Sequence, residues 1–302
     1  MNKIKQWLQN RDVIMVLALC LGLLWGEGAR WTQGLTLPAL AFVMTLSTMG
    51  VTGGAFRPPR ALLVPALAGI AMNYFLLGSV LLLLGQFLIG DPALRSGFVI
   101  IAAVPPAVAV IPFTFFLQGD STFTFVGTVG AYLGALILTP LIALWFLGGD
   151  FISPGKLFMI MVQLILIPWV ASRVLIRAGL ASRIEPIKGK LTNWSFFLLT
   201  YIIVGVNREV FLMQPLSLAP VAVIAVASTF LLGWGIEKAG NFFRVPHGKV
   251  VSLVLLGTLK NYGLAGGLSL ALFSNQTAVP ATVSSVFMII YIIWLQFKKR
   301  KT

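Results

Sequence analysis

The chain has 302 residues, of which 58% are hydrophobic and 10% are charged, and its mean hydropathy is +0.96. This composition lies far outside the range of soluble domains and predicts an integral membrane protein. The formal net charge of +14 would also suit a nucleic-acid-binding protein, but cytoplasmic loops rich in Lys and Arg give a membrane protein the same excess. The single cysteine, Cys20, excludes an internal disulfide and a multi-thiolate metal site.

Ten apolar runs follow one another along the chain, and we compare them with the roughly 20 residues that a helix needs to cross the hydrocarbon core. They cover residues 12–26, 35–52, 61–88, 93–117, 121–148, 156–176, 191–207, 217–236, 248–273 and 277–297. No small-residue cleavage site follows the first run, so we expect a retained span rather than a signal peptide. Because the runs lack the alternation of a barrel and open sheets are unstable in lipid, we predict helices.

Positive charge is distributed unevenly between the runs. With the N-terminus placed in the cytoplasm, the inside segments carry 17 Lys and Arg residues and the outside segments carry four. This bias predicts an even number of spans with both termini cytoplasmic, and we expect a multi-pass protein of the cell inner (plasma) membrane. Topology thus explains most of the basic excess, so we expect no nucleic-acid partner.

Lys260 is the one ionisable residue that lies deep within an apolar run; the acidic residues fall at span ends or between spans. A charged lysine at the bilayer centre costs about 2.5 to 3.5 kcal/mol on insertion scales, so we expect it to face protein or a wet cavity. No nucleophile with its base, metal cluster or carboxylate pair occurs at that depth, so we do not expect an enzyme. We also expect no cofactor and no bound metal.

An internal repeat relates the two halves of the chain. A shift of 155 residues places the runs 35–52, 61–88 and 121–148 on runs of the second half, and it places the proline pair near 105 on residues 260–261. Five spans per half is an odd number, so the halves 1–150 and 151–302 would enter the membrane from opposite sides and form one membrane domain. Discontinuous helices at matching places in inverted repeats indicate the substrate site of a secondary transporter.

Helix-breaking residues define the two expected interruptions, near 104–112 and 257–263. Prolines remove backbone donors and leave carbonyl groups that must find other partners, whereas glycines allow kinking and close approach. The alternative is a pair of kinked but continuous, tightly packed helices. The residues that we assign to the breaks are Pro105, Pro106, Pro112, Gly257 and Gly263.

Several motifs in chain order resemble the bile acid:sodium symporter family. They are "LTLPALAFVMTLSTMG", "LLVPALAGIAMNYF", "AAVPPAVAVIPFTFFLQGDSTF", "LGTLKNYGLAGGLSLALF" and "AVPATVSSVFMIIYI", and together they extend over nearly the whole chain. The resemblance implies ten helices in two inverted repeats, a panel domain beside a core domain, and two unwound helices, the fourth and ninth spans, that cross near the midplane.

The sequence departs from that family at the sodium ligands. Val110 and Ile111 stand where the family has Ser and Asn, and Leu256 aligns with a glutamate that serves both sodium sites. Sodium needs several oxygen ligands, usually with a carboxylate to balance its charge. The resemblance therefore implies a sodium-site-depleted member, with the fold of the family but without sodium coupling.

The candidate substrate-binding residues lie at or near the two breaks. Asn261 matches the family at a site position, Lys260 and Asn73 align with family glutamines, and the remaining candidates are Thr114 and Thr258. Three roles for Lys260 remain open: a built-in cation that also attracts an organic anion, a group that loads and releases a proton, or a cap for free carbonyls without significance for transport.

These features predict a secondary active transporter of small organic anions that works by alternating access and is not coupled to sodium. A proton is the alternative coupling ion. The alternatives for function are a sodium-coupled symporter with altered cation ligands and an ion channel. A channel needs a continuous polar pore, whereas inverted breaks around one site fit alternating access.

Overall fold

The computed structural model describes residues 11–49, 59–107, 109–148, 159, 162–206, 208–213 and 215–299. Both chain termini, the expected boundary at 150–151 and the first residues of the run 156–176 lie outside the described residues. Within the described part of the chain, every regular element is a helix, and one isolated β-bridge is present. The helical class predicted from the apolar runs is therefore confirmed.

The first half of the chain contains eight α-helices among the described residues. They are α2 (Arg11–Leu24), α3 (Gly26–Thr32), α4 (Thr36–Thr48), α5 (Pro59–Ile70), α6 (Ser79–Leu88), α7 (Pro92–Ala103), α8 (Val110–Phe116) and α9 (Ser121–Leu147). A 3-10 turn, η1 (Gln33–Leu35), precedes α4, and a π-helical segment, η3 (Ala71–Gly78), joins α5 to α6.

The second half repeats this pattern of long and interrupted helices. Its α-helices among the described residues are α11 (Ile167–Arg177), α12 (Ala181–Val206), α13 (Arg208–Met213), α14 (Ala219–Val226), α15 (Leu232–Phe242), α16 (His247–Leu256), α17 (Tyr262–Leu272) and α18 (Val279–Lys299). Four short segments connect them: the π-helical η4 (Val162–Leu166) and η6 (Ala227–Leu231), and the 3-10 turns η5 (Pro215–Leu218) and η7 (Gln276–Ala278).

Five helices among the described residues are long and apolar enough to cross a membrane: Leu62–Leu88, Ser121–Leu147, Ala181–Val206, Ala219–Phe242 and Gln276–Lys298. Three further apolar helices, Pro92–Ala103, His247–Leu256 and Tyr262–Leu272, have about half that length. Half-length helices in an apolar chain indicate interruptions inside the bilayer rather than short spans, because the hydrocarbon core needs roughly 20 helical residues.

The helix α12 begins earlier than the sequence predicts. The apolar run begins at residue 191, but the helix starts at Ala181, so charges that we expected between spans lie on its first turns. Lys188 and Glu185, three residues apart, form an exposed ion pair there with a 3.4 Å Nζ–Oε2 distance. The apolar run ends at the first charged residues. The helix itself extends further, because its backbone hydrogen bonds do not depend on apolar side chains.

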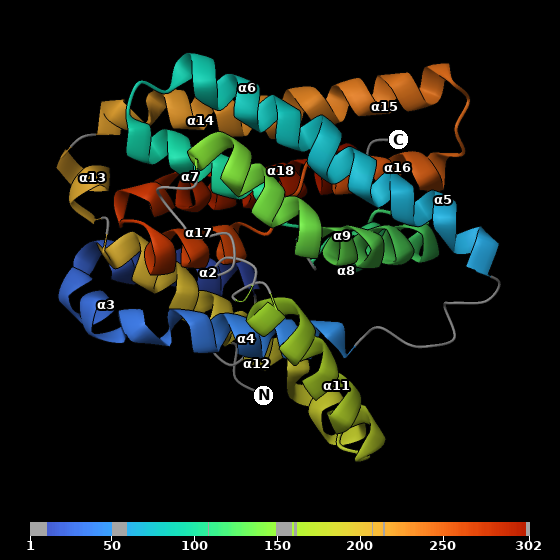
Figure 1. The fold of residues 1–302 in the computed structure, drawn as a ribbon, viewed down its shortest axis with the longest axis horizontal. Helices are drawn as coiled ribbons and strands as arrows, with labels where there is room; N and C mark the ends of the chain where they lie inside the picture. The colour runs from blue at the N-terminus through green and yellow to red at the C-terminus, as the bar shows by residue number, and fades with distance from the viewer. Residues whose placement is uncertain are drawn as a thin grey trace.

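The helices form two groups (Figure 1). The helices α2, α3, α4, α11 and α12 pack against one another in the lower part of the view. The helices α5 to α9 and α14 to α18 fill the upper part, with α5 against α9 and α14 against α18. Contacts between the groups run from α17 and α18 to α4 and α12. The interrupted helices therefore belong to one group, and α17 contacts the other.

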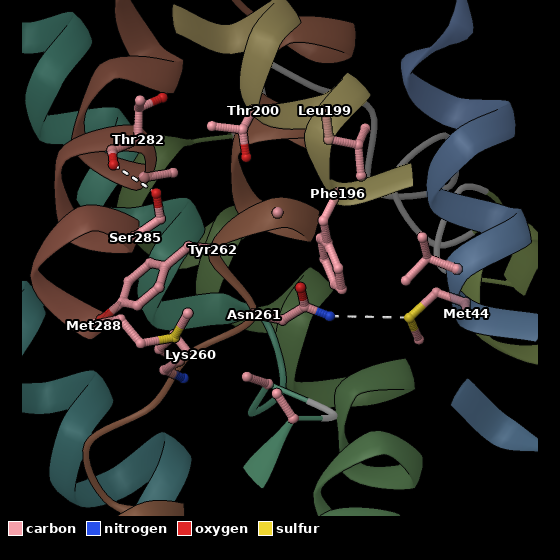
Figure 2. Close-up of a pocket in the computed structure, with 15 residues that line it drawn as sticks. Met44, Phe196, Leu199, Thr200, Lys260, Asn261, Tyr262, Thr282, Ser285 and Met288 are labelled. Atoms are coloured by element: carbon pink, nitrogen blue, oxygen red, sulfur yellow. Dashed lines mark hydrogen bonds between the residues drawn. The ribbon is translucent and has the colours of Figure 1, made fainter. Parts of the chain in front are cut away.

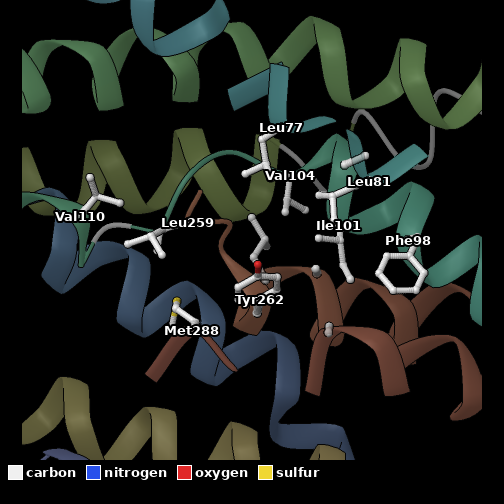
Figure 3. Packing of buried hydrophobic residues seen from close by; sticks show 14 of the residues in the cluster. Leu77, Leu81, Phe98, Ile101, Val104, Val110, Leu259, Tyr262 and Met288 are labelled. Atoms are coloured by element: carbon white, nitrogen blue, oxygen red, sulfur yellow. The ribbon is translucent and has the colours of Figure 1, made fainter. Parts of the chain in front are cut away.

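The main buried cluster surrounds the interruptions (Figure 3). Leu77 and Leu81 pack near Ile101 and Val104 at the end of α7, and Leu259 lies beyond them at the second interruption. By contrast, large apolar side chains point outward along the long helices; Trp145, for example, is 86% exposed. An apolar exterior around a packed core is the arrangement expected of helices whose solvent is lipid.

Two glycines allow α5 and α9 to approach each other closely. A Cβ atom added to Gly69 would overlap the backbone of Gly127, and one added to Gly127 would lie 2.9 Å from Leu256 Cδ1 and 3.1 Å from the carbonyl oxygen of Pro65. Small residues at helix contacts are the usual means of close packing in membranes. This contact places α9 directly against the interrupted helix that contains Leu256.

We predict that Gly69→Ala lowers the stability of the purified protein by about 1 to 3 kcal/mol, because the added methyl group meets backbone that cannot move aside. Thermal unfolding in detergent, followed by circular dichroism, measures the change. Gly235→Ala in α15 is the matched control, since a Cβ there meets nothing within 4 Å. Equal melting temperatures for the two variants would contradict the close contact.

Candidate functional site

Two interrupted helices meet backbone to backbone near the centre of the structure. The helix α7 ends at Ala103 and α8 begins at Val110, while α16 ends at Leu256 and α17 begins at Tyr262. The two connecting segments pair as an antiparallel bridge between Pro106 and Lys260. The N–H of Asn261 donates to the carbonyl of Pro105 at 3.0 Å, and the N–H of Ala107 donates to the carbonyl of Leu259 at 3.3 Å.

The proline pair explains why α7 ends. In a continuous helix the carbonyl of Ala102 would accept from the N–H of residue 106, but Pro106 has none. The next carbonyl, of Ala103, would accept from the N–H of Ala107, but that N–H donates to Leu259. The carbonyl of Ala103 accepts from the hydroxyl of Thr139 on α9 at 2.6 Å instead. Pro112 lies within the first turn of α8, where a missing N–H removes no helical hydrogen bond.

The glycines of the second interruption lie where space is short. Gly257 follows the last residue of α16, and a Cβ there would lie 2.7 Å from Met72 Cε and 2.8 Å from Ile236 Cδ1. Gly263 is the second residue of α17, and a Cβ there would lie 3.3 Å from the Phe196 ring. Both ends of the second interruption are therefore tightly packed.

Lys260 fills the positions that the first interruption leaves open. Its side chain is completely buried. The ammonium donates to the carbonyl of Ala102 at 2.7 Å, to the carbonyl of Val104 at 2.9 Å and to Oδ1 of Asn73 at 2.8 Å. An ammonium has three donors, so these three acceptors use all of them.

Two further features stabilise a cation at this position. The ammonium lies 4.7 Å from the ring centroid of Tyr74, a cation–π distance. It also lies at the C-terminal end of α7, where the helix dipole favours positive charge. Asn73 and Tyr74 both belong to the π-helical segment η3, a kind of irregularity that often occurs at functional sites. The Nδ2 atom of Asn73 is buried without a hydrogen-bond partner among the described residues.

Asn261 connects the second interruption to the two neighbouring helices. Its Oδ1 accepts from the N–H of Leu264 at 3.1 Å and so caps α17. Its Nδ2 donates to the hydroxyl of Tyr132 on α9 at 3.1 Å, and the sulfur of Met44 on α4 lies 3.9 Å away. Asn261 therefore fixes the start of α17 and reaches toward the other group of helices (Figure 2).

A cavity of about 50 Å³ lies between the second interruption and the other group of helices. Its lining combines apolar side chains with polar ones, and Thr200 from α12 faces Thr282 and Ser285 from α18 across it (Figure 2). This volume suits a few water molecules and is far below the roughly 300 Å³ of small-ligand sites. The cavity is therefore too small for an organic substrate in this conformation. The residues that line it include Met44, Phe196, Thr200, Lys260, Asn261, Tyr262, Gly263, Thr282, Ser285 and Met288.

The structure separates the five candidate substrate-binding residues. Asn261 and Lys260 border the cavity, but the ammonium of Lys260 points away from Thr200 and Thr282 (Figure 2). Asn73 contacts Lys260 rather than the cavity. Thr114 and Thr258 border no part of the cavity: their hydroxyls donate to the carbonyls of Val110 and Val254 one turn earlier, at 2.8 and 2.6 Å. Buried threonines in helices satisfy themselves in this way.

Sequence reasoning missed the polar residues that α9, α12 and α18 contribute. The hydroxyls of Thr139 and Tyr132 contact the two interruptions, and Thr200, Thr282 and Ser285 border the cavity. The available signal was the occurrence of hydroxyl groups in the middle of apolar runs. That signal identifies buried polar groups, but it does not distinguish a hydroxyl at a site from one that bonds its own helix.

No protein-family model matches the chain. Over 195 residues, 63% of this chain, the sequence is 24% identical to a protein of Bacillus subtilis named uncharacterized sodium-dependent transporter YocS. The chain is similar to a transporter. The match spans 60% of the relative's own length, which is less than two thirds. Together with the apolar helices, it supports a multi-pass membrane transporter.

We predict that Lys260→Met lowers the stability of the protein by at least about 2 kcal/mol, because each buried acceptor left without a donor costs about 1 to 3 kcal/mol. Lys249→Met, an exposed lysine on α16, is the matched control and is expected to change stability little. Thermal unfolding in detergent compares the two.

A second substitution tests whether the loss arises from the unmet acceptors. Asn73→Leu removes one of the three acceptors, so in the Lys260→Met background it should restore part of the stability, whereas alone it should destabilise the protein. Additive effects of the two substitutions would contradict the direct interaction.

Proposed function

We propose that this chain is a secondary active transporter that moves a small organic anion by alternating access without sodium coupling. The observation that carries the proposal is the meeting of two interrupted helices beside a cavity with a mixed apolar and polar lining, with a buried lysine at the crossing. In transporters, discontinuous helices near the midplane form the substrate site, and backbone without helical partners is tolerated there because it lines a cavity.

The proposed architecture is ten helices in two inverted repeats of five. A shift of 155 residues moves η3 (Ala71–Gly78) onto 226–233, where η6 (Ala227–Leu231) lies. The same shift moves α7 onto 247–258 and α8 onto 265–271, which overlap α16 and α17. Each interrupted pair then counts as one span, which gives five spans per half and the opposite orientation of the second half.

Two hydrogen-bonded contacts at opposite ends of the interrupted helices also support the repeat. Near the start of α7, Gln276 donates to the carboxylate of Asp91 at 2.8 Å. Near the start of α16, the N–H of Asp120 donates to the carbonyl of Gly248 at 2.8 Å. The shift places each contact within two residues of the other. The group formed by α2, α3, α4, α11 and α12 would be the panel, and the remaining helices would be the core.

The site favours a small anion over a cation. Among the described residues that line the cavity, none is acidic, and the start of α17 presents its positive dipole end beside Asn261 and Gly263. Lys260 adds positive potential from behind, although its three donors are already bound to protein. The cavity of about 50 Å³ would have to enlarge by relative movement of the two helix groups, which is the movement that alternating access requires.

Of the three roles for Lys260, the geometry supports a fixed cation that holds the crossing together. Each acceptor of its ammonium is a neutral oxygen within 2.7 to 2.9 Å, so the charge is stabilised where it lies. Carriage of a proton would require water to reach a fully buried nitrogen and three hydrogen bonds to break. Direct contact of the Lys260 ammonium with the anion would also require these hydrogen bonds to break.

Sodium does not fit at the crossing. Val110 and Leu256 are buried apolar side chains that offer no oxygen ligand, and Ile111 also lacks one. The free carbonyls of Ala102 and Val104 already hold an ammonium, and a second cation among the same oxygens would be repelled.

The second candidate is a sodium-coupled symporter whose cation binds elsewhere. The printed name of the Bacillus subtilis relative, a sodium-dependent transporter, favours this alternative. In that case the oxygen ligands would be carbonyl and hydroxyl groups rather than carboxylates. The dependence of transport on sodium separates the two candidates.

We predict that uptake of the transported anion into proteoliposomes is unchanged when sodium is exchanged for potassium at constant pH and membrane voltage. The assay screens a panel of small carboxylates and sulfonates, with liposomes without protein as the control. Collapse of uptake on sodium removal would favour the sodium-coupled candidate. Absence of uptake for every anion under any gradient would contradict the proposed substrate class.

The same assay distinguishes the roles of Lys260. As a fixed cation, Lys260→Arg should retain part of the transport because the charge remains, and Lys260→Met should abolish it in protein that still inserts. As a proton carrier, Lys260→Arg should fail too, since arginine does not deprotonate in proteins. Full activity of Lys260→Met would leave the lysine a cap without a role in transport.

The cavity itself is tested by filling it. We predict that Thr282→Phe abolishes transport, because the side chain occupies a cavity of about 50 Å³ that must open for substrate. Ile290→Phe, on the outward side of the same helix and 48% exposed, should leave transport intact. Gly263→Ala is the milder variant and should reduce uptake, since its methyl group would lie 3.3 Å from Phe196. Equal uptake by all three would place the substrate elsewhere.

A further inference from the structure

A second cavity lies away from the crossing, where α6, α7 and α9 meet. Its volume is about 540 Å³, within the roughly 300 to 1,000 Å³ of small-molecule sites. It lies near the end of α6 at Leu88, the start of α7 at Pro92 and the end of α9 at Leu147. These helix ends mark one border of the apolar spans, so the cavity lies at the polar edge of the membrane rather than at its centre.

One cation, Arg95, contributes to the lining of this cavity. Its Nη2 donates to the carbonyl of Gly90 at 3.3 Å, but its Nε is buried and has no hydrogen-bond partner among the described residues. A buried donor of a charged group without an acceptor is costly and requires an explanation. A movement of the side chain toward an acceptor in the cavity would complete it.

The nearest acid does not neutralise Arg95. Asp91 uses one oxygen to cap α7, accepting from the N–H groups of Ala93 and Leu94, and its other oxygen accepts from Gln276. No ion pair joins Arg95 to an acidic residue in the described part of the chain. The cavity therefore presents an uncompensated positive charge that an anion would complement.

The remaining lining suits a molecule with a polar head and an apolar body. The polar side chains of Ser79, Gln86 and Ser96 share the cavity with Arg95. Apolar residues form the rest, and among them Leu83 and Phe146 are more than half exposed. The cavity thus joins a charged group to exposed apolar side chains.

We propose that this cavity binds an anionic phospholipid, with the phosphate group paired to Arg95 and the acyl chains lying along Leu83 and Phe146. Guanidinium groups bind phosphate through paired, charge-assisted hydrogen bonds, and Arg95 has Nη donors beyond the one bond to the carbonyl of Gly90. The apolar opening accounts for a lipid rather than a free ion. This proposal concerns lipid binding alone and is independent of what the chain transports.

The test uses the full-length purified protein in detergent and native mass spectrometry. Phosphatidylglycerol and phosphatidylcholine with identical acyl chains are the probes. We expect wild-type protein to retain phosphatidylglycerol about tenfold more strongly, as one charge-assisted contact allows. Arg95→Gln should lose this preference, and Arg95→Lys should keep part of it. Arg30→Gln, which removes an exposed arginine paired with Glu209, is the control and should behave as wild type.

A variant that leaves the charge in place tests the cavity separately. Ser79→Trp would narrow the cavity without touching Arg95 and should also lower phosphatidylglycerol retention. Unchanged retention in Arg95→Gln would overturn the proposal. Displacement of phosphatidylglycerol by millimolar inorganic phosphate, equally for short and long acyl chains, would overturn the assignment to a lipid, because the apolar part would then contribute nothing.

Discussion

The hydrogen bonds of the Lys260 ammonium to Ala102, Val104 and Asn73 are the interaction on which the rest of the structure depends. Within a bilayer no water replaces a missing backbone partner, so an interrupted helix persists only where other protein groups complete it. The proline pair removes donors from α7, and the lysine returns donors at the same place. A buried cation and unpaired buried carbonyls are each costly alone, and the hydrogen bonds between them reduce both costs.

The crossing in turn positions the cavity. Because Lys260 holds the first interruption and Asn261 caps α17, the start of α17 faces the space between α4, α12 and α18. A covalently attached cation also makes the crossing independent of ion concentration. In the proposed mechanism, the breaks stay intact through the transport cycle and movement occurs between the two helix groups, driven by the substrate gradient or by another coupling ion.

Lys260 and Arg95, two of the 22 Lys and Arg residues of the chain, differ in how their donors are satisfied. Lys260 lies deep and has every donor satisfied by protein, which fits a structural charge that does not move. Arg95 lines the second cavity and has a buried donor without a partner among the described residues, which suits its proposed role at the membrane border. The difference follows from depth, because only the border gives access to the phosphate groups of lipids.

The sequence by itself determined the membrane class, the helical fold and the places at which two helices stop. Composition, prolines and glycines are local properties, and the adjacent prolines at 105 and 106 remove two consecutive backbone donors. Single prolines do not always end a helix here, since Pro65, Pro140 and Pro186 lie inside α5, α9 and α12. The sequence also singled out Lys260, since a charge in an apolar run is costly in any fold. It was wrong about the start of α12, because helix length is set by backbone hydrogen bonds and not by apolarity alone.

Only the tertiary structure decided which groups meet at the site. Lys260 finds Asn73 and Ala102 more than 150 residues away, and no local spacing encodes such a contact. The same holds for Thr139 and Tyr132 on α9. Nothing in the sequence distinguishes them from other hydroxyl residues in apolar runs. Their roles depend on which helix face packs against the crossing, and that is fixed by close contacts such as Gly69 against Gly127. Packing between distant segments therefore places a buried lysine where it caps the end of an interrupted helix.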